Sequence, residues 1–322
     1  TIAAGSMPVK EVTPGTCSRI MTGAALPAGA DYVFMLEDAE ELPDGRVRFT
    51  GRPGNDNFAR VGEDYMNGQT VLKPGRYIKP QDIAVMSAVG TTMVTVSCRP
   101  RLGVISTGNE LVEPDIVPAG AQIRNSNALQ LMAQIARAEA TGTYYGIARD
   151  EEEHISSLVQ KALEENDVVI ISGGVSFGDF DLVPRVIRSL GLTMHFDQVA
   201  MQPGKPLTFC TGEKKALFGL PGNPVSTLVQ FEIMVRAFLD KMTGVTGREM
   251  ILQLPLARDY SRKRAERLSW IPCTLTTAGE AMPLEYHGSA HISALSDAWG
   301  IITIPRGQSW IQKGEMVSVR QI

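Results

Sequence analysis

The chain has 322 residues, 43% of them hydrophobic, and a formal net charge of −4 at pH 7. A chain of this length predicts two or three domains, because a domain averages roughly 100 to 200 residues. The slightly acidic balance argues against a nucleic-acid partner, since surfaces that bind nucleic acid carry a basic excess. No apolar run reaches the roughly 18 residues that span a bilayer, and no signal pattern follows Thr1. We therefore expect a cytoplasmic protein with no membrane partner.

The first 70 residues are rich in turn formers that separate short strand-like runs, such as residues 32–35 and 47–50. This alternation of turn formers and short strand-like runs predicts a small β domain at residues 1–70. Residues 71–98 differ, because a helical stretch that begins after a proline and an acid is followed by the β-branched run 91–96. We interpret residues 71–98 as a connecting layer.

Strand and helix patterns alternate through residues 99–246. The expected helices share an apolar stripe at helical spacing and cover residues 126–139 with Ser126 as the cap, 150–163, 182–190 and 225–242. Alternation of this kind predicts an α/β domain with a mostly parallel sheet covered on both faces. Residues 247–322 return to short strands, which predicts a C-terminal β domain. The expected fold class is α/β plus β, in a multidomain, elongated chain.

Two glycine-containing loops follow strands of the α/β segment. The candidate binding residues of these loops are Ser172, Gly173, Gly174 and Ser176 in the first, and Pro221, Gly222, Asn223 and Pro224 in the second. Open α/β sheets hold ligands at the carboxyl ends of their strands, and glycine lets a phosphate approach backbone N–H groups. The second loop also precedes a helix, whose free N–H groups suit an anion, although a plain helix start is the alternative. The loops predict a phosphorylated small-molecule ligand.

One cation and three acids are the other candidates. Lys205 stands between two prolines, a stiff way to aim an ammonium group at an oxyanion, although a solvated lysine in a turn explains it equally well. Glu110, Asp150 and Asp181 each follow a strand, so their carboxylates are expected at one edge of the sheet, where they suit Mg²⁺. The alternative for Asp150 and Asp181 is that they cap helices. The coincidence of three acids at strand ends favours metal-assisted phosphate chemistry.

The cysteines and histidines suggest no further site. The four cysteines, which we expect to be buried thiols, are Cys17, Cys98, Cys210 and Cys273. They form no CxxC motif and have no histidine at ligand spacing, so neither a zinc site nor a disulfide framework is indicated. The histidines make no HxxxH-type pair on a recognisable helix, so a metal held by nitrogen ligands is not expected.

These motifs, taken in order, resemble the molybdopterin molybdenumtransferase family, the bacterial MoeA type that is shared with the gephyrin E domain. The matching segments are residues 19–24, 62–64, 106–111, 172–176 with Asp181, 203–206, 219–226 and 288–289. The resemblance covers nearly the whole chain. It implies Mg²⁺-dependent insertion of molybdate into adenylylated molybdopterin, with release of AMP, in an elongated homodimer whose cleft draws on both subunits.

The resemblance also implies roles for particular residues. Asp150 and Asp181 match acids needed for activity, and Glu110 matches a glutamate of the same cleft, so these three are the expected catalytic and metal-binding residues. Thr22 and Asp64 match cleft residues that the second subunit supplies. The remaining matches are Pro221 and Pro224 in a proline turn, and Ser289 in the last domain.

The sequence departs from the family pattern at several positions. Gln198 and Gln202 stand where many members carry lysines, and Pro272 stands where we align an arginine. Losing up to three cations weakens the expected affinity for anions, and Arg267 or Arg19 is the candidate replacement. The family's amino-terminal helical segment has no counterpart before Thr1, so residues 71–98 are expected to be part of an otherwise missing domain.

Two other functions compete with the transferase. A catalytically weak scaffold protein that keeps the molybdopterin pocket fits the missing cations, but a scaffold has no reason to keep three acids that repel a phosphate. A hydrolase of nucleotide-like phosphates would need neither flanking β domain. We therefore expect the transferase.

Overall fold

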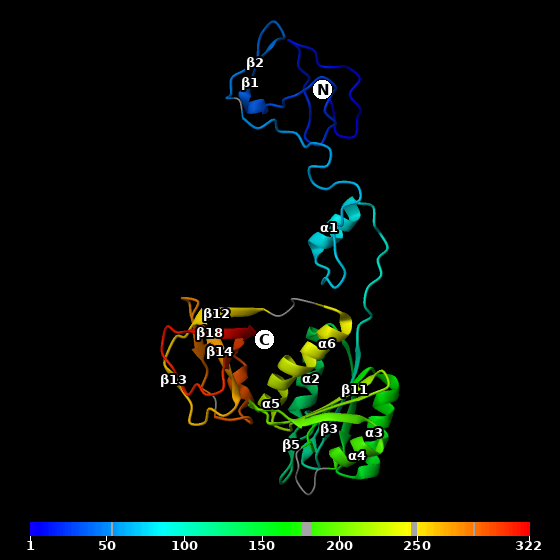
Figure 1. Cartoon of the computed structure of the whole chain (residues 1–322), viewed down its shortest axis with the longest axis vertical. Coiled ribbons are helices and arrows are strands. Elements are labelled where there is room, and N and C mark those ends of the chain that lie inside the picture. The colour runs from blue at the N-terminus through cyan, green and yellow to red at the C-terminus, as the bar shows by residue number, and fades with distance from the viewer. Residues whose placement is uncertain (53, 176–181, 246–249, 286) are drawn as a thin grey trace. The chain divides into compact units, whose positions relative to one another are not determined.

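The computed structural model describes residues 1–52, 54–175, 182–245, 250–285 and 287–322. Contacts divide the chain into two compact units, Thr1–Lys73 and Pro74–Ile322 (Figure 1). The predicted domain boundaries after residues 98 and 246 fall inside the second unit, and they stay predictions.

The first unit has little regular secondary structure. An antiparallel pair, β1 (Ala39–Glu41) and β2 (Val47–Phe49), follows a single 3-10 turn at Leu36–Asp38. The predicted strand at residues 32–35 is wrong. The Val33 N–H donates to the carbonyl of Asp56, and its carbonyl accepts from the Asn57 side chain, so loop contacts satisfy this backbone in place of a ladder.

The second unit contains a six-stranded mixed sheet. In spatial order its strands are β6 (Thr141–Ala148), β3 (Arg101–Thr107), β7 (Val168–Ser172), β11 (Lys215–Leu220), β10 (Pro206–Gly212) and β8 (Thr193–Gln198). The first four are parallel, whereas β10 is antiparallel to both of its neighbours. All of β7 is buried, as expected for a central strand covered on both faces. The predicted α/β domain is confirmed.

Helices cover both faces of this sheet (Figure 1). One face carries α2 (Ser126–Arg137) and a helical run made of α5 (Pro224–Gln230), a π-helical turn (Phe231–Val235) and α6 (Arg236–Thr243). The other face carries α3 (Glu152–Glu165) and α4 (Val183–Ser189). The predicted cap of α2 is wrong by one residue. Asn125 is the cap, and its side-chain oxygen accepts from the Ala128 N–H.

The C-terminal segment forms the predicted β domain. Its main sheet has the order β12 (Ile251–Pro255), β18 (Met316–Gln321), β16 (Gly300–Ile304), β14 (Leu268–Leu275) and β15 (Ala281–Pro283). The smaller elements of this domain are β13 (Tyr260–Ser261), β17 (Trp310–Ile311) and a 3-10 turn at Ile292–Leu295. The fold class, α/β plus β, is therefore confirmed.

Short elements connect these domains. The helix α1 (Pro80–Ala88) precedes the α/β domain, and the parallel pair β4 (Leu111–Val112) and β5 (Ile123–Arg124) lies in the segment between β3 and α2. The strand β9 (Met201–Gln202) leaves the α/β domain and pairs with β14 of the C-terminal sheet. None of the helices within the described residues is long and apolar enough to span a membrane.

The four thiols differ in their environment, which corrects the expectation that all are buried. Cys210 and Cys273 are buried in sheet cores, whereas Cys17 and Cys98 are exposed. Burial raises the pKa of Cys210 to about 11 and that of Cys273 to about 12, because an apolar interior disfavours a thiolate.

We expect a thiol reagent at pH 8 to modify Cys17 and Cys98 rapidly in the folded protein, while Cys210 and Cys273 stay protonated and shielded. Titration with a chromogenic disulfide, before and after denaturation, measures this. The expected counts are two thiols and then four. Rapid reaction of all four in folded protein would contradict the assigned burial.

Candidate functional site

The carboxyl ends of four neighbouring strands lie at one edge of the α/β sheet. The register aligns Thr107 of β3 with Ala148 of β6, and Ser172 of β7 with Leu220 of β11. The loops that follow these strands carry Glu110, Asp150, the Gly173–Gly174 pair and the Pro221–Pro224 turn. The structure therefore brings these predicted residues to one edge, as parallel strands require.

The first glycine loop packs against β3. Gly173 and Gly174 both have positive φ, +96° and +61°. A Cβ at Gly173 would lie 2.5 Å from the carbonyl oxygen of Thr107, and one at Gly174 would lie 2.8 Å from the Thr107 hydroxyl. Both positions therefore need glycine, for backbone conformation and for space. Ser176 and Asp181 lie outside the described residues.

The two glycine loops are tied together by Asn127, a residue that the sequence analysis missed. Its side-chain N–H groups donate to the Ser172 hydroxyl and to the Gly222 carbonyl, each at 2.8 Å. Ser172 is 1% exposed, so its hydroxyl supports the loops and does not line a cavity. The only available signal was a polar residue at the start of a helix, which usually indicates a cap.

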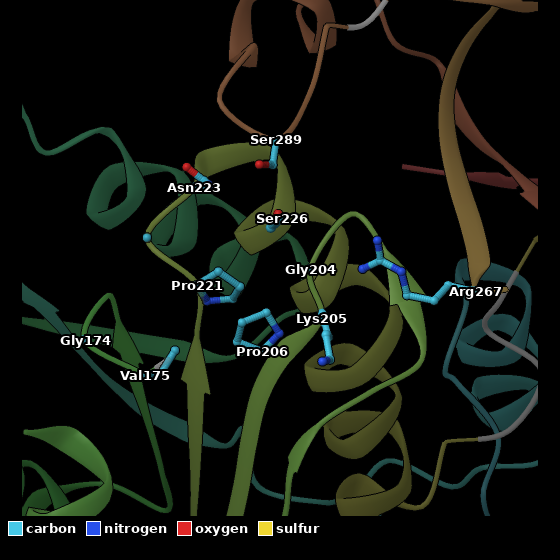
Figure 2. A pocket seen from close by; sticks show the side chains of 11 residues that line it. Gly174, Val175, Gly204, Lys205, Pro206, Pro221, Asn223, Ser226, Arg267 and Ser289 are labelled. Carbon is cyan, nitrogen blue, oxygen red and sulfur yellow. The ribbon is translucent and has the colours of Figure 1, made fainter. Parts of the chain in front are cut away.

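A cavity of about 370 Å³ opens between these loops and the C-terminal domain (Figure 2). The predicted residues that line it are Gly174, Lys205, Pro221, Gly222, Asn223 and Ser289. The lining residues outside the predicted set are Val175, Gly204, Pro206, Ser226 and Arg267. Arg267, the candidate replacement cation, thus lies at the cavity, whereas Arg19 belongs to the first unit.

The side chain of Gln230 supports the turn that carries Lys205. The side-chain N–H groups of this fully buried residue donate to the carbonyls of Gly204 (2.9 Å) and Pro206 (2.8 Å), on either side of Lys205. A Cβ at Gly204 would lie 2.6 Å from the Gln230 amide nitrogen, so the close approach requires glycine. Lys205 itself is exposed and, within the described part of the chain, forms no ion pair.

The start of helix α5 is partly used by the protein itself. The Val225 N–H donates to the carbonyl of Ser289 at 3.1 Å, and the Thr227 hydroxyl donates to the Pro221 and Asn223 carbonyls. One of the helix N–H groups expected to be free for an anion is therefore occupied. Ser289 takes part through its backbone as well as by lining the cavity.

Glu110 and Asp150 lie in adjoining loops. The Asp150 carboxylate accepts from the Asn109 N–H (3.1 Å), and the Asn109 side chain accepts from the Asp150 N–H (3.2 Å). The Glu110 carboxylate lies against Gly108, within 2.6 Å of where a Cβ would be. The alternative that Asp150 caps α3 is wrong, because its carboxylate bridges to the neighbouring loop and Glu151 occupies the cap position.

Both carboxylates are exposed, and neither pairs with a cation among the described residues. Within the same residues, no group of three His, Cys, Asp or Glu side chains could hold a metal ion. Asp181, the third predicted ligand, is outside this set. Thr22 and Asp64 are exposed residues of the first unit. Gln198, Gln202 and Pro272 are not among the residues that line the cavity.

Replacing Gln230 with methionine tests the support of the Lys205 turn. The change keeps the side-chain length but leaves the carbonyls of Gly204 and Pro206 without their donor, so we expect the free energy of unfolding to fall by about 1–3 kcal/mol. Chemical denaturation of the purified protein measures it. Gln160→Met on the exposed face of α3 is the matched control and should change stability by less than about 0.5 kcal/mol. An equal loss of unfolding free energy in the two variants would contradict the proposed support of the Lys205 turn by Gln230.

Family models match three parts of the chain. They are described as the MoeA N-terminal region (domain I and II), over residues 1–90, a probable molybdopterin binding domain, over residues 103–241, and the MoeA C-terminal region (domain IV), over residues 253–322. Together these matches cover most of the sequence and include both loops of the cavity.

Similar proteins agree with these matches. A molybdopterin molybdenumtransferase of Staphylococcus aureus is 35% identical over 324 residues, which cover 99% of this chain and 77% of the relative. One from Staphylococcus epidermidis is 34% identical with the same coverage. The crystal structure of a molybdopterin biosynthesis MoeA protein from Pyrococcus horikoshii OT3 superposes with a TM-score of 0.82, at 29% identity over 99% of this chain and 79% of that one. The chain therefore belongs to the molybdopterin molybdenumtransferase (MoeA) family, the transferases of molybdenum cofactor biosynthesis.

Proposed function

We propose that the protein inserts molybdate into adenylylated molybdopterin and releases AMP, in a Mg²⁺-dependent reaction. The observation that carries the proposal is the cavity that Lys205 shares with two glycine loops, at the sheet edge that also presents Glu110 and Asp150. A substrate with a phosphoanhydride needs cations and backbone donors at one place and a metal-binding acid nearby. The names of the relatives from two Staphylococcus species support this substrate class.

The donor chemistry at the sheet edge suits Mg²⁺. Glu110 and Asp150 offer hard carboxylate oxygens from adjoining loops, and both are exposed without a cationic partner among the described residues. Mg²⁺ in proteins is commonly bound by one or two carboxylates and completed by substrate phosphates and water. We assign Glu110 and Asp150, with Asp181, as its ligands. When bound, the ion would neutralise charge on the phosphate and molybdate oxygens.

The residues of this chain supply binding and orientation. Lys205 would hold an anionic group of the substrate, because Gln230 fixes the turn on both sides of it and leaves its ammonium group exposed to the cavity. Gly174 and Gly222 let the substrate approach the backbone closely. Molybdate and the phosphoanhydride are both anions, so the positions of fixed positive charge decide whether the two can meet.

Charge removal at the two carboxylates tests the metal assignment. We expect Asp150→Asn and Glu110→Gln to lower AMP release by about 100-fold or more, the order seen when one electrostatic contact to a transition state is lost. Asparagine at position 150 keeps an acceptor for the Asn109 N–H, so the loop should keep its form. The assay follows AMP after mixing protein, adenylylated molybdopterin, MgCl₂ and molybdate.

Glu153→Gln is the matched control, since Glu153 is an exposed acid in the first turn of α3. Its turnover should equal that of the parent protein. Full activity in both test variants would remove the carboxylate mechanism. A parent protein that binds the adenylylated substrate but releases no AMP would favour the scaffold alternative.

We also propose that the protein is a homodimer. The segment around α1 exposes several apolar side chains, including Ile83 (55% exposed) and Met93 (88% exposed), and the residue that α1 buries is the acid Asp82. The hydrogen bond from Arg76 lowers the pKa of Asp82. Among the apolar residues of α1, Val85 and Met86 are half-buried, whereas Ile83 is exposed. An apolar outer face of this kind is typical of an interface.

Light scattering after size exclusion tests the dimer. We expect a mass twice the 34.9 kDa of one chain for the parent protein. Met93→Glu places a charge in the apolar segment and should shift the mass toward one chain, because an unpaired charge at an interface is costly. Met316→Glu, at an exposed methionine of β18, is the control and should leave the mass unchanged. A parent protein with the mass of one chain would rule out the dimer.

A further inference from the structure

The loop between β3 and α2 carries Glu110 and closes on itself through the short pair of β4 and β5. The Ile123 N–H donates to the carbonyl of Glu110, and the Asn125 N–H donates to the carbonyl of Val112, each at 2.8 Å. Apolar side chains of this loop are exposed, including Val117 (80% exposed) and Ile123 (55% exposed). A two-residue ladder with exposed apolar side chains opens easily when nothing else holds it.

Tyr144 ties this loop to the sheet. The residue lies on β6, and its ring packs against the core cluster on the α2 side of the sheet. Its hydroxyl donates to the Glu113 carboxylate at 2.9 Å and accepts from the side-chain N–H of Asn125 at 2.8 Å. Glu113 directly follows β4, and Asn125 directly follows β5. One hydroxyl therefore holds the carboxyl ends of both short strands.

Asn125 is anchored in turn by the core of the α/β domain. It is 1% exposed, and its side-chain oxygen accepts from the Ser106 hydroxyl of β3 at 3.2 Å as well as from the first turn of α2. A buried amide with partners on several sides has little freedom to move. The network therefore runs from β3, β6 and α2 to the loop of Glu110.

The bond from Tyr144 to Glu113 has a fixed direction. Burial raises the pKa of Tyr144, and the hydrogen bond and the charge of Glu113 raise it further, so the phenol keeps its proton and is the donor. A hydrogen bond to a carboxylate is stronger than one between neutral groups. Neither residue, nor Asn125, is among the described residues that line the cavity, so the network would act on the site only through the loop.

We propose that Tyr144 is a positioning residue, which fixes the β4–β5 loop through Glu113 and thereby holds Glu110 at the sheet edge. The inference rests on the proposed function for the role of Glu110 as a ligand of Mg²⁺. A mobile loop must lose conformational freedom when its carboxylate binds a metal ion, and this loss weakens the binding. Residues that orient metal ligands contribute roughly 10- to 100-fold to metal affinity.

Replacing Tyr144 with phenylalanine removes the hydroxyl and keeps the packed ring. In the protein without substrate, we expect the backbone amides of residues 108–125 to exchange hydrogen about 10-fold faster or more, because the loop opens more often. The amides of β7 should keep their rate. Hydrogen exchange followed by mass spectrometry of peptides measures both segments.

Metal binding is the second readout, with Mn²⁺ as the probe because it takes the same oxygen ligands as Mg²⁺. Titration followed by electron paramagnetic resonance should give a Kd for Mn²⁺ that is about 10-fold higher or more in Tyr144→Phe. A contribution to folding stability alone would leave the Kd of the folded variant unchanged.

The Mg²⁺ dependence of AMP release is the third readout. The MgCl₂ concentration that gives half of the maximal rate should rise by about 10-fold or more in Tyr144→Phe. The KM for adenylylated molybdopterin, measured at saturating MgCl₂, should equal that of the parent protein. Glu113→Gln keeps an acceptor for the hydroxyl, so its MgCl₂ requirement should lie between those of the parent protein and Glu113→Ala.

Tyr145→Phe is the matched control. Tyr145 is the next residue of β6 and packs against the core cluster on the opposite face of the sheet. Its hydroxyl donates to Glu165 and accepts from the Asn166 side chain, at the end of α3. The control loses the same chemical group, yet it should leave loop exchange and the Kd for Mn²⁺ unchanged.

Three results would overturn the proposal. They are equal effects of the two tyrosine changes, unchanged exchange of residues 108–125 in a folded Tyr144→Phe protein, and unchanged Mn²⁺ binding in that protein. Glu113→Ala breaks the same bond from the side of the loop, and it decides the case by the same measurements if the Tyr144 variant is unstable.

The readouts without substrate separate this inference from the proposed function. A parent protein that binds Mn²⁺ in a Tyr144-dependent way but releases no AMP would support the inference and reject the transferase reaction. AMP release with a MgCl₂ requirement that Tyr144→Phe leaves unchanged would reject the inference and support the reaction.

Discussion

The packing of the C-terminal sheet against helix α5 is the interaction on which the cavity depends. Val225 and Val229 of α5 form one buried cluster with Trp270, Leu295 and Ile301 of the C-terminal domain. Burying an aliphatic side chain of this size stabilises by about 1.5–3 kcal/mol, so the cluster as a whole can hold two domains together. The β9–β14 pairing and the bond from Val225 to Ser289 then fix the relative position of the two domains.

The residues that hold the loops of the site in place differ from the residues that would contact a substrate. Buried amides hold the loops: Asn127 links the two glycine loops, and Gln230 holds the turn of Lys205. The charged groups, Lys205, Glu110 and Asp150, are exposed and form no ion pair within the described chain. Side-chain amides are neutral, so their hydrogen bonds to backbone carbonyls can fix a loop without neutralising the charged side chains that would bind a substrate.

A charged network supports α5 and α6 from the side of α2. Glu232, 1% exposed in the π-helical turn, accepts from Gln134 and Arg137 of α2 and from Arg236 of its own helix. A buried carboxylate is tolerated because several donors surround it. Since Gln230 directly precedes this turn, the same helical segment carries both the network and the support of Lys205.

The amino-acid sequence by itself determined the domain types and most of the candidate site. Alternating apolar patterns predicted the α/β domain and the C-terminal β domain, and glycine, proline and acid positions after strands predicted which loops meet. These features are local: a strand ends where its apolar run ends, and parallel strands end together. The predicted strand at residues 32–35, which the structure does not contain, shows the limit of this reasoning. Hydrogen bonds from residues 56 and 57 satisfy the backbone of Val33 there, in place of pairing with another strand. Tertiary structure alone decided the roles of Asn127 and Gln230 and placed Arg267 at the cavity. Each of these depends on contacts between segments far apart in the chain, and a single sequence does not show which distant groups its folded core will bring within hydrogen-bonding distance.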